Sequence, residues 1–165
     1  MKSARDLTEL ALLSASILVV GSIKLPGLIP GAEFQLSAPL AVAIAANFGF
    51  ARYLTAGVVA SLLCLMLGTH NLLNVAVAMI FRVVAGGTVG LLGSRPIVIA
   101  LAGPLGSIAA RLALSLLVGK AAWALVAAAV PGMIFTVLTA YPLTRIMQRV
   151  LAQIGGPAAG RKAGA

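Results

Sequence analysis

Residues 71–93, NLLNVAVAMIFRVVAGGTVGLLG, decide the fold, and Arg82 is the single charged residue among them. Residues 96–119, PIVIALAGPLGSIAARLALSLLVG, likewise contain one charge, Arg111. Each stretch is long enough to cross a membrane as a helix, which takes about 20 apolar residues. A central arginine costs roughly 2.5–3.5 kcal/mol on insertion scales, so such residues usually face a bundle interior or a wet cavity. The two arginines therefore predict a polar feature inside a membrane bundle.

The composition of the whole chain also indicates a membrane protein. Of its 165 residues, 61% are hydrophobic and 9% are charged, and the mean hydropathy is +1.12. These values lie outside the range of a soluble globular domain. At about 20 residues a span, we expect a compact all-α bundle of six transmembrane helices over 1–150, followed by a disordered Gly/Ala-rich tail over 151–165. The predicted spans are 7–23, 36–50, 53–67, 72–92, 96–118 and 121–143.

The basic residues predict how this bundle is oriented. The net charge of +9 is spread singly over the ends of segments, which is typical of topology signals and unlike a phosphate-binding face. If the N-terminus is cytoplasmic, the external side carries only Lys24 and Lys120. The cytoplasmic side then carries Lys2, Arg5, Arg52, Arg95, Arg145, Arg149, Arg161 and Lys162. The positive-inside rule therefore predicts that both termini are cytoplasmic, in a bacterial inner membrane.

This orientation places two polar segments outside the membrane. Residues 24–35, KLPGLIPGAEFQ, carry two prolines and two glycines and must leave regular helix. The turn around His70 contains the single histidine of the chain. We expect both segments to lie over the mouth of a site that is open to the outside.

Two polar stripes define that site. Asn74, Ala78 and Arg82 share one face of the fourth span, and Asn71 continues this stripe toward the outside. Ser107, Arg111 and Ser115 repeat the spacing on the fifth span. If the stripes face each other they form a groove whose two arginines suit an anionic group such as a carboxylate. The predicted substrate-binding residues are Glu33, Gln35, His70, Asn71, Asn74, Arg82 and Arg111.

Structural roles for the same residues stay open. A membrane arginine can donate to backbone carbonyls or pair with Glu33, and small or polar residues at this spacing commonly pack helices together. The His70 position is typical of a turn residue. Tyr53 and Trp123, near the ends of spans, are expected to be interfacial anchors.

The sequence gives little support for catalysis. It has one histidine, three acidic residues and one cysteine, Cys64, which lies within an apolar run. A metal site or a disulfide framework would need more ligands or cysteines. No P-loop and no glycine-framed serine motif is present, so we expect neither an enzyme nor a cofactor.

A compact six-span chain with both ends inside resembles the substrate-binding S components of energy-coupling factor (ECF) transporters. In that family the first helix carries an A-x-x-x-A pattern, and residues 11–15, ALLSA, match it here. The resemblance implies that Ala11 and Ala15 pack on a transmembrane coupling subunit, which works with a pair of ATPases. It also implies that 26–35 and 69–74 close over the substrate.

The order PGAEFQLSAPLAV, then GTHNLLNVAVAMIFR, is faintly similar to the tryptophan-transport members. The acidic residue and the asparagine before the fourth span match in position, and the full motifs do not.

The resulting prediction is a substrate-capture subunit for a small nutrient, a vitamin or an amino-acid-like compound, that depends on a separate ATP-driven module. The alternative is a non-transporting scaffold of cell-envelope machinery, similar to the small multi-spanning MreD-type proteins. An intramembrane enzyme that uses His70 is a third reading.

Overall fold

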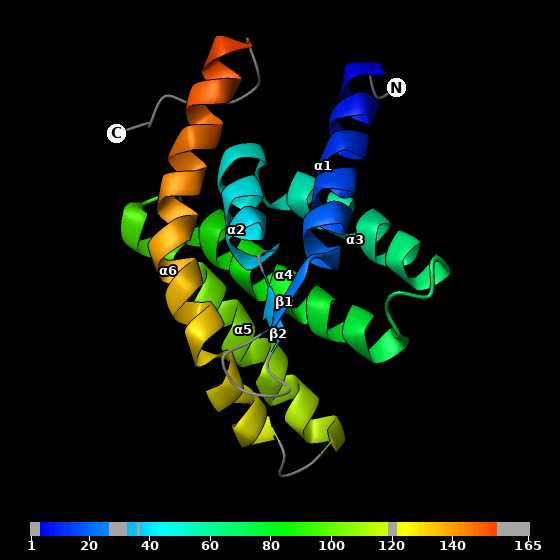
Figure 1. The fold of residues 1–165 in the computed structure, drawn as a ribbon. Coiled ribbons are helices and arrows are strands. Elements are labelled where there is room, and N and C mark those ends of the chain that lie inside the picture. The colour runs from blue at the N-terminus through cyan, green and yellow to red at the C-terminus, as the bar shows by residue number, and fades with distance from the viewer. Residues whose placement is uncertain (1–3, 27–32, 36, 119–121, 155–165) are drawn as a thin grey trace.

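The structure, a computed structural model, describes residues 4–26, 33–35, 37–118 and 122–154. Within these ranges the chain forms six helices and a two-stranded hairpin (Figure 1). The helices are α1 Ala4–Ser22, α2 Ser37–Phe48, α3 Phe50–Met66, α4 Leu72–Leu92, α5 Pro96–Val118 and α6 Ala122–Gln153. The strands β1 Lys24–Pro26 and β2 Glu33–Gln35 pair antiparallel, with Leu25 opposite Phe34.

Local sequence signals account for the ends of the helices. Asn71 caps α4, because its side chain accepts a hydrogen bond from the backbone N–H of Asn74. Gly93 ends that helix at φ 81°, a conformation that favours glycine, and Pro96 occupies the first position of α5. Gly49, at φ 85°, separates α2 from α3 in the same way. The predicted spans 72–92 and 96–118 are therefore confirmed as helices.

Two segments differ in detail from the predicted helices. The Pro/Gly segment does leave helix, as expected, and its flanks form the short β1–β2 hairpin; the six helices keep the fold in the predicted all-α class. Helix α6 continues through Pro131 and Pro142 to Gln153, well beyond the predicted end at 143. Neighbouring helices can accommodate a proline within a membrane helix, so Pro142 is not a reliable stop. Residues 155–165 of the predicted disordered tail lie outside the described residues.

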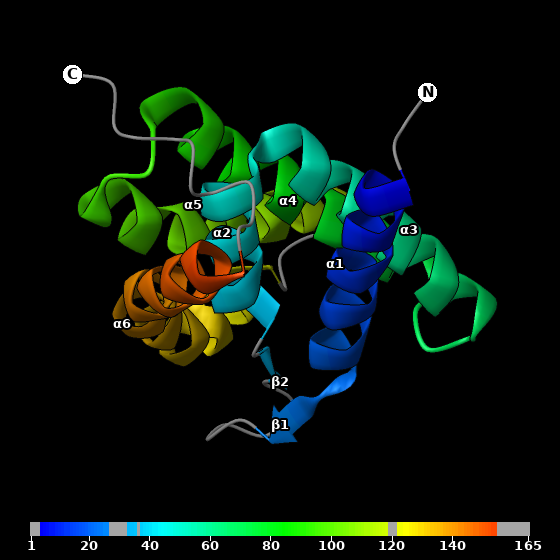
Figure 2. The same cartoon turned by 90° about the horizontal axis from the view of Figure 1, so that it is seen from above.

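The helices are arranged in two sets. Figures 1 and 2 show α1, α2 and α6 on one side and α3 and α4 crossing behind them. Helix α5 joins the two sets because it packs on both α4 and α6. The start of α1 and the end of α6 lie at the same end of the molecule (Figure 1). This agrees with termini on one side of a membrane, while the orientation itself stays a prediction.

Small residues allow the helices to approach closely. A Cβ on Gly106 of α5 would lie 2.9 Å from the Ala85 Cβ of α4, and one on Gly86 of α4 would lie 2.8 Å from the Tyr53 ring of α3. Gly103 of α5 packs in the same manner against Thr136 of α6. Such small-residue crossings are the usual packing mode of membrane helices.

The surface of the bundle is apolar. Leu91 and Leu116 are each 88% exposed. Among the described residues, three helical segments are long and apolar enough to span a membrane: Leu72–Leu92, Pro96–Leu116 and Val126–Gln153. Helices α2 and α3 are apolar but shorter. Because so much exposed apolar surface requires a lipid environment, the chain is a membrane protein. The six crossings stay a prediction.

Candidate functional site

Arg82 lies at the interface between α4 and α3 and is 9% exposed. Its Nη1 donates a hydrogen bond to Ser61 Oγ of α3 at 2.6 Å and contacts Met79 Sδ of its own helix at 3.6 Å. Within the described part of the chain, these are the hydrogen bonds of the guanidinium. No acceptor lies in hydrogen-bond geometry with its Nε and Nη2 edge among the described residues, although a guanidinium has five N–H donors and the Tyr53 oxygen attracts this one.

Gly57 of α3 provides the space for this side chain. A Cβ at Gly57 would collide with the Cδ and Nε atoms of Arg82. The long side chain of Arg82 therefore lies directly on the α3 backbone, and its charged end reaches Ser61, one helical turn farther along α3. Gly57 and Ser61 form one face of α3 because residues four apart lie one above the other on a helix.

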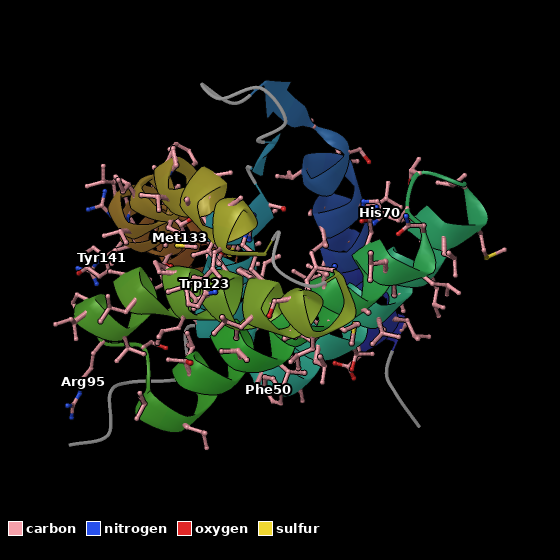
Figure 3. All side chains as sticks on the ribbon, turned by 90° about the horizontal axis from the view of Figure 1, so that it is seen from below. Phe50, His70, Arg95, Trp123, Met133 and Tyr141 are labelled. Atoms are coloured by element: carbon pink, nitrogen blue, oxygen red, sulfur yellow. The ribbon has the colours of Figure 1, made fainter. Side chains whose placement is uncertain are left out.

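Tyr53 completes this face of α3 on the other side of Gly57. It is fully buried, with its ring against Gly86 of α4, and its hydroxyl lies within electrostatic range of Arg82. The hydroxyl reaches no hydrogen-bond geometry with any described residue. The expectation that Tyr53 is an interfacial anchor is therefore wrong, whereas Trp123 is 73% exposed near the start of α6 (Figure 3).

A carboxylate of the chain could neutralise the charge of Arg82 by pairing with it, so the positions of the acidic residues matter. Two of the three acidic residues, Asp6 and Glu9 of α1, pair with Arg52 of α3 at 3.5 Å and 2.9 Å. The third, Glu33, belongs to β2, which packs on α6. The described residues thus give Arg82 a hydroxyl and a thioether as acceptors and no carboxylate.

The predicted groove placed Arg82 opposite the Arg111 stripe of α5, and the structure turns Arg82 toward α3 instead. At its own position Arg82 faces α3, and the α4 residues that face Gly106 of α5 are Phe81 and Ala85. A polar stripe fixes one face of a helix but not the neighbour that covers it, which is why the sequence indicated α5. Arg111 is half-buried on α5. Whether it joins the Arg82 site stays a prediction.

The turn residues are accounted for by local structure. The Asn71 side chain accepts a hydrogen bond of 2.8 Å from the Asn74 backbone, and the side chains of both asparagines are exposed. The backbone N–H groups of Thr69 and His70 donate to the Cys64 carbonyl, and His70 is half-buried at the α3–α4 connection (Figure 3). A capping role does not exclude ligand contact, so their binding role stays a prediction.

Two further groups of predicted residues lie on β2 and on α1. The side chains of Glu33 and Gln35 lie outside the described residues, although their backbone forms β2. Ala11 and Ala15 are exposed on α1, while Leu13, Ser14 and Ile17 form the face of α1 that packs inward. The described residues therefore leave the small-residue face of α1 exposed.

Sequence reasoning missed Tyr53, Gly57 and Ser61. The signal was present, because these residues follow each other at i, i+4 and i+8 on α3. The same periodicity rule that selected the Arg82 stripe would have selected this one. In the described residues, no cluster of three metal-ligating side chains occurs.

The fold and the buried polar residues define a helical integral membrane protein. No family model matches the chain, and no solved structure matches it. The chain is 45% identical over 154 residues to Protein BioX of Lysinibacillus sphaericus, which covers 93% of each protein. At this identity and coverage, the chain belongs to the BioX family.

Proposed function

We propose that this protein is the substrate-binding S component of an ECF-type transporter that takes up a small carboxylate-bearing vitamin. It binds the substrate from the external side and works with a separate transmembrane coupling subunit and an ATPase pair. The BioX relationship, the apolar helical fold and the uncovered Ala11–Ala15 face of α1 support this proposal. The similarity to the tryptophan-transport members stays a prediction.

The environment of Arg82 is the observation that carries the proposal. A cation that is nine-tenths buried among apolar helices is expensive unless an anion compensates it. The described residues supply neutral acceptors at one nitrogen. A substrate carboxylate at the opposite edge would complete the pairing, since guanidinium and carboxylate match in geometry and charge. Arg111 would add a second cationic contact from α5.

The test is ligand binding by arginine variants in purified protein. Biotin, pantothenate and nicotinate serve as probes, each a vitamin with a carboxylate. We expect Arg82→Ala and Arg111→Ala to weaken binding at least thirtyfold, because a desolvated charge contact is worth about 2–5 kcal/mol. Arg82→Lys should recover binding only in part, since lysine lacks the forked pair of donors. Arg95→Ala is the matched control because Arg95 is exposed at the α4–α5 turn (Figure 3).

Two results would contradict the proposal. If both variants fold and keep full affinity, the arginines do not bind substrate. If the wild-type protein binds none of the three acids, and uptake assays with a coupling module show no transport, a scaffold function of the MreD type is favoured instead.

A further inference from the structure

The hydroxyl of Tyr53 is a buried donor with no acceptor in the described structure. Its side chain is 0% exposed, and its oxygen has no hydrogen-bond partner among the described residues. Leaving a buried polar group of this kind unpaired is unfavourable. The phenol lies beside a guanidinium, which is itself a donor and cannot accept its proton.

Arg82 and Tyr53 are neighbouring side chains, and each has a hydrogen-bond donor without an acceptor. Neither the Nε and Nη2 edge of Arg82 nor the O–H of Tyr53 has an acceptor in hydrogen-bond geometry among the described residues. Gly57 follows Tyr53 by one turn of α3, and the Arg82 side chain lies against it. One ionised carboxylate offers two oxygens and about four acceptor sites. It could accept from Arg82 and Tyr53 together, whereas a neutral amide offers a single oxygen and brings N–H donors of its own.

We propose that Tyr53 determines specificity at the Arg82 site: its O–H donates to one oxygen of the substrate carboxylate, and the site thereby selects the ionised acid over its amide. This inference rests on the proposed function. Ser61 is a positioning residue in this arrangement, because its Oγ accepts from Nη1 at 2.6 Å and thereby fixes one end of the guanidinium.

The alternative is that Tyr53 serves packing alone. Its ring lies against Gly86, where a Cβ would come within 3.0 Å of Cε1, so the aromatic body clearly fills space between α3 and α4. Phenylalanine keeps that ring and removes only the oxygen. Tyr53→Phe therefore separates the hydroxyl from the packing. Tyr141→Phe is the matched control, since Tyr141 lies on α6, where its ring centroid is 5.9 Å from Arg145 Cζ.

The experiment measures the affinity of three acids and their amides: biotin and biotinamide, pantothenate and its amide, nicotinate and nicotinamide. We expect Tyr53→Phe to weaken binding of the recognised acid about 10- to 100-fold, the usual worth of a hydrogen bond to a charged group. Affinity for the matching amide should stay within about threefold, which the scatter of small changes allows. Ser61→Ala should lower the acid-to-amide ratio less than Tyr53→Phe does. Tyr141→Phe should change neither affinity.

Each other outcome overturns the inference in a distinct way. Equal losses for acid and amide in Tyr53→Phe would make the hydroxyl structural. Unchanged acid binding in Tyr53→Phe, together with loss in Arg82→Ala, would refute the role of Tyr53 and leave the proposed function standing. Unchanged binding in both variants, or no binding of any acid by the wild type, would refute both.

Discussion

The side chain of Arg82 on α4 occupies the space that any side chain on Gly57 of α3 would need. The two residues are therefore mutually dependent. Without a glycine at 57, the guanidinium could not lie on the α3 backbone and reach Ser61. Without the arginine, Gly57 would leave a void between the two helices.

Gly57→Ala should displace Arg82 and destabilise the protein by about 1–3 kcal/mol, the usual cost of overpacking. Gly87→Ala is the matched control, because a Cβ at that position of α4 meets nothing within 4 Å. Its effect should stay within about 0.5 kcal/mol. Thermal unfolding in detergent measures the first effect, and ligand affinity should fall in Gly57→Ala only. Identical behaviour of the two variants would show that Arg82 repositions without cost.

The ion pair of Arg52 and Glu9 should contribute little to stability. The Arg52 side chain is 45% exposed, and exposed pairs contribute about 0.2–1 kcal/mol. A double-mutant cycle of Arg52→Gln and Glu9→Gln should give a coupling energy in this range. Raising the salt from about 0.1 M to 1 M should reduce it, as the screening length falls from about 10 Å to 3 Å. A large, salt-insensitive coupling would mean that the pair is shielded from water.

The membrane orientation predicts which positions react with an impermeant thiol reagent. In a Cys64→Ala background, Ser94→Cys should be protected in intact cells and Thr69→Cys should be labelled. Cys64 is buried, so its removal leaves the outer surface unchanged. Reporter fusions at the C-terminus should read cytoplasmic, and fusions within 26–33 external. Labelling of Ser94→Cys from outside would reverse the assignment of the external site.

The exposed alanines of α1 predict a partner surface. Ala11→Leu and Ala15→Leu should lower co-purification with a coupling subunit at least tenfold, a loss of about 1.4 kcal/mol. Ligand affinity should not change, because both alanines point away from the chain. Ala127→Leu on α6 is the control for an added apolar side chain at an exposed position. If the complex survives all three changes, the α1 face contacts lipid instead.

The helices were predictable where short signals mark both ends. Helix α4 lies between Asn71, a cap, and Gly93, a residue at positive φ, and both signals are visible in the sequence. The end of α6 was not predictable, because Pro142 resembles a stop and the helix packs through it to Leu151, which is buried. The hairpin could not be distinguished from a loop, since its strands are three residues each.

The site was predictable only as far as one helix at a time. Periodicity showed that Arg82 lies on a defined face of α4, and burial of a lone charge indicated a functional interior. Which helix covers that face depends on the crossing of α3 and α4, where Gly86 lies against the Tyr53 ring. Such a contact between residues distant in sequence leaves no periodic trace.

Arg52 and Tyr53 are consecutive residues of α3, yet one pairs with Glu9 of α1 and the other lies beside Arg82. A helix moves largely as a rigid rod, so a displacement of α3 that follows occupancy of the interior also changes the separation between Arg52 and α1. Ligand binding in the interior and the contacts of α1 both involve α3, so the two equilibria are thermodynamically linked. If ligand binding changes the affinity of α1 for the proposed coupling subunit by some factor, binding of that subunit must change the affinity for the ligand by the same factor.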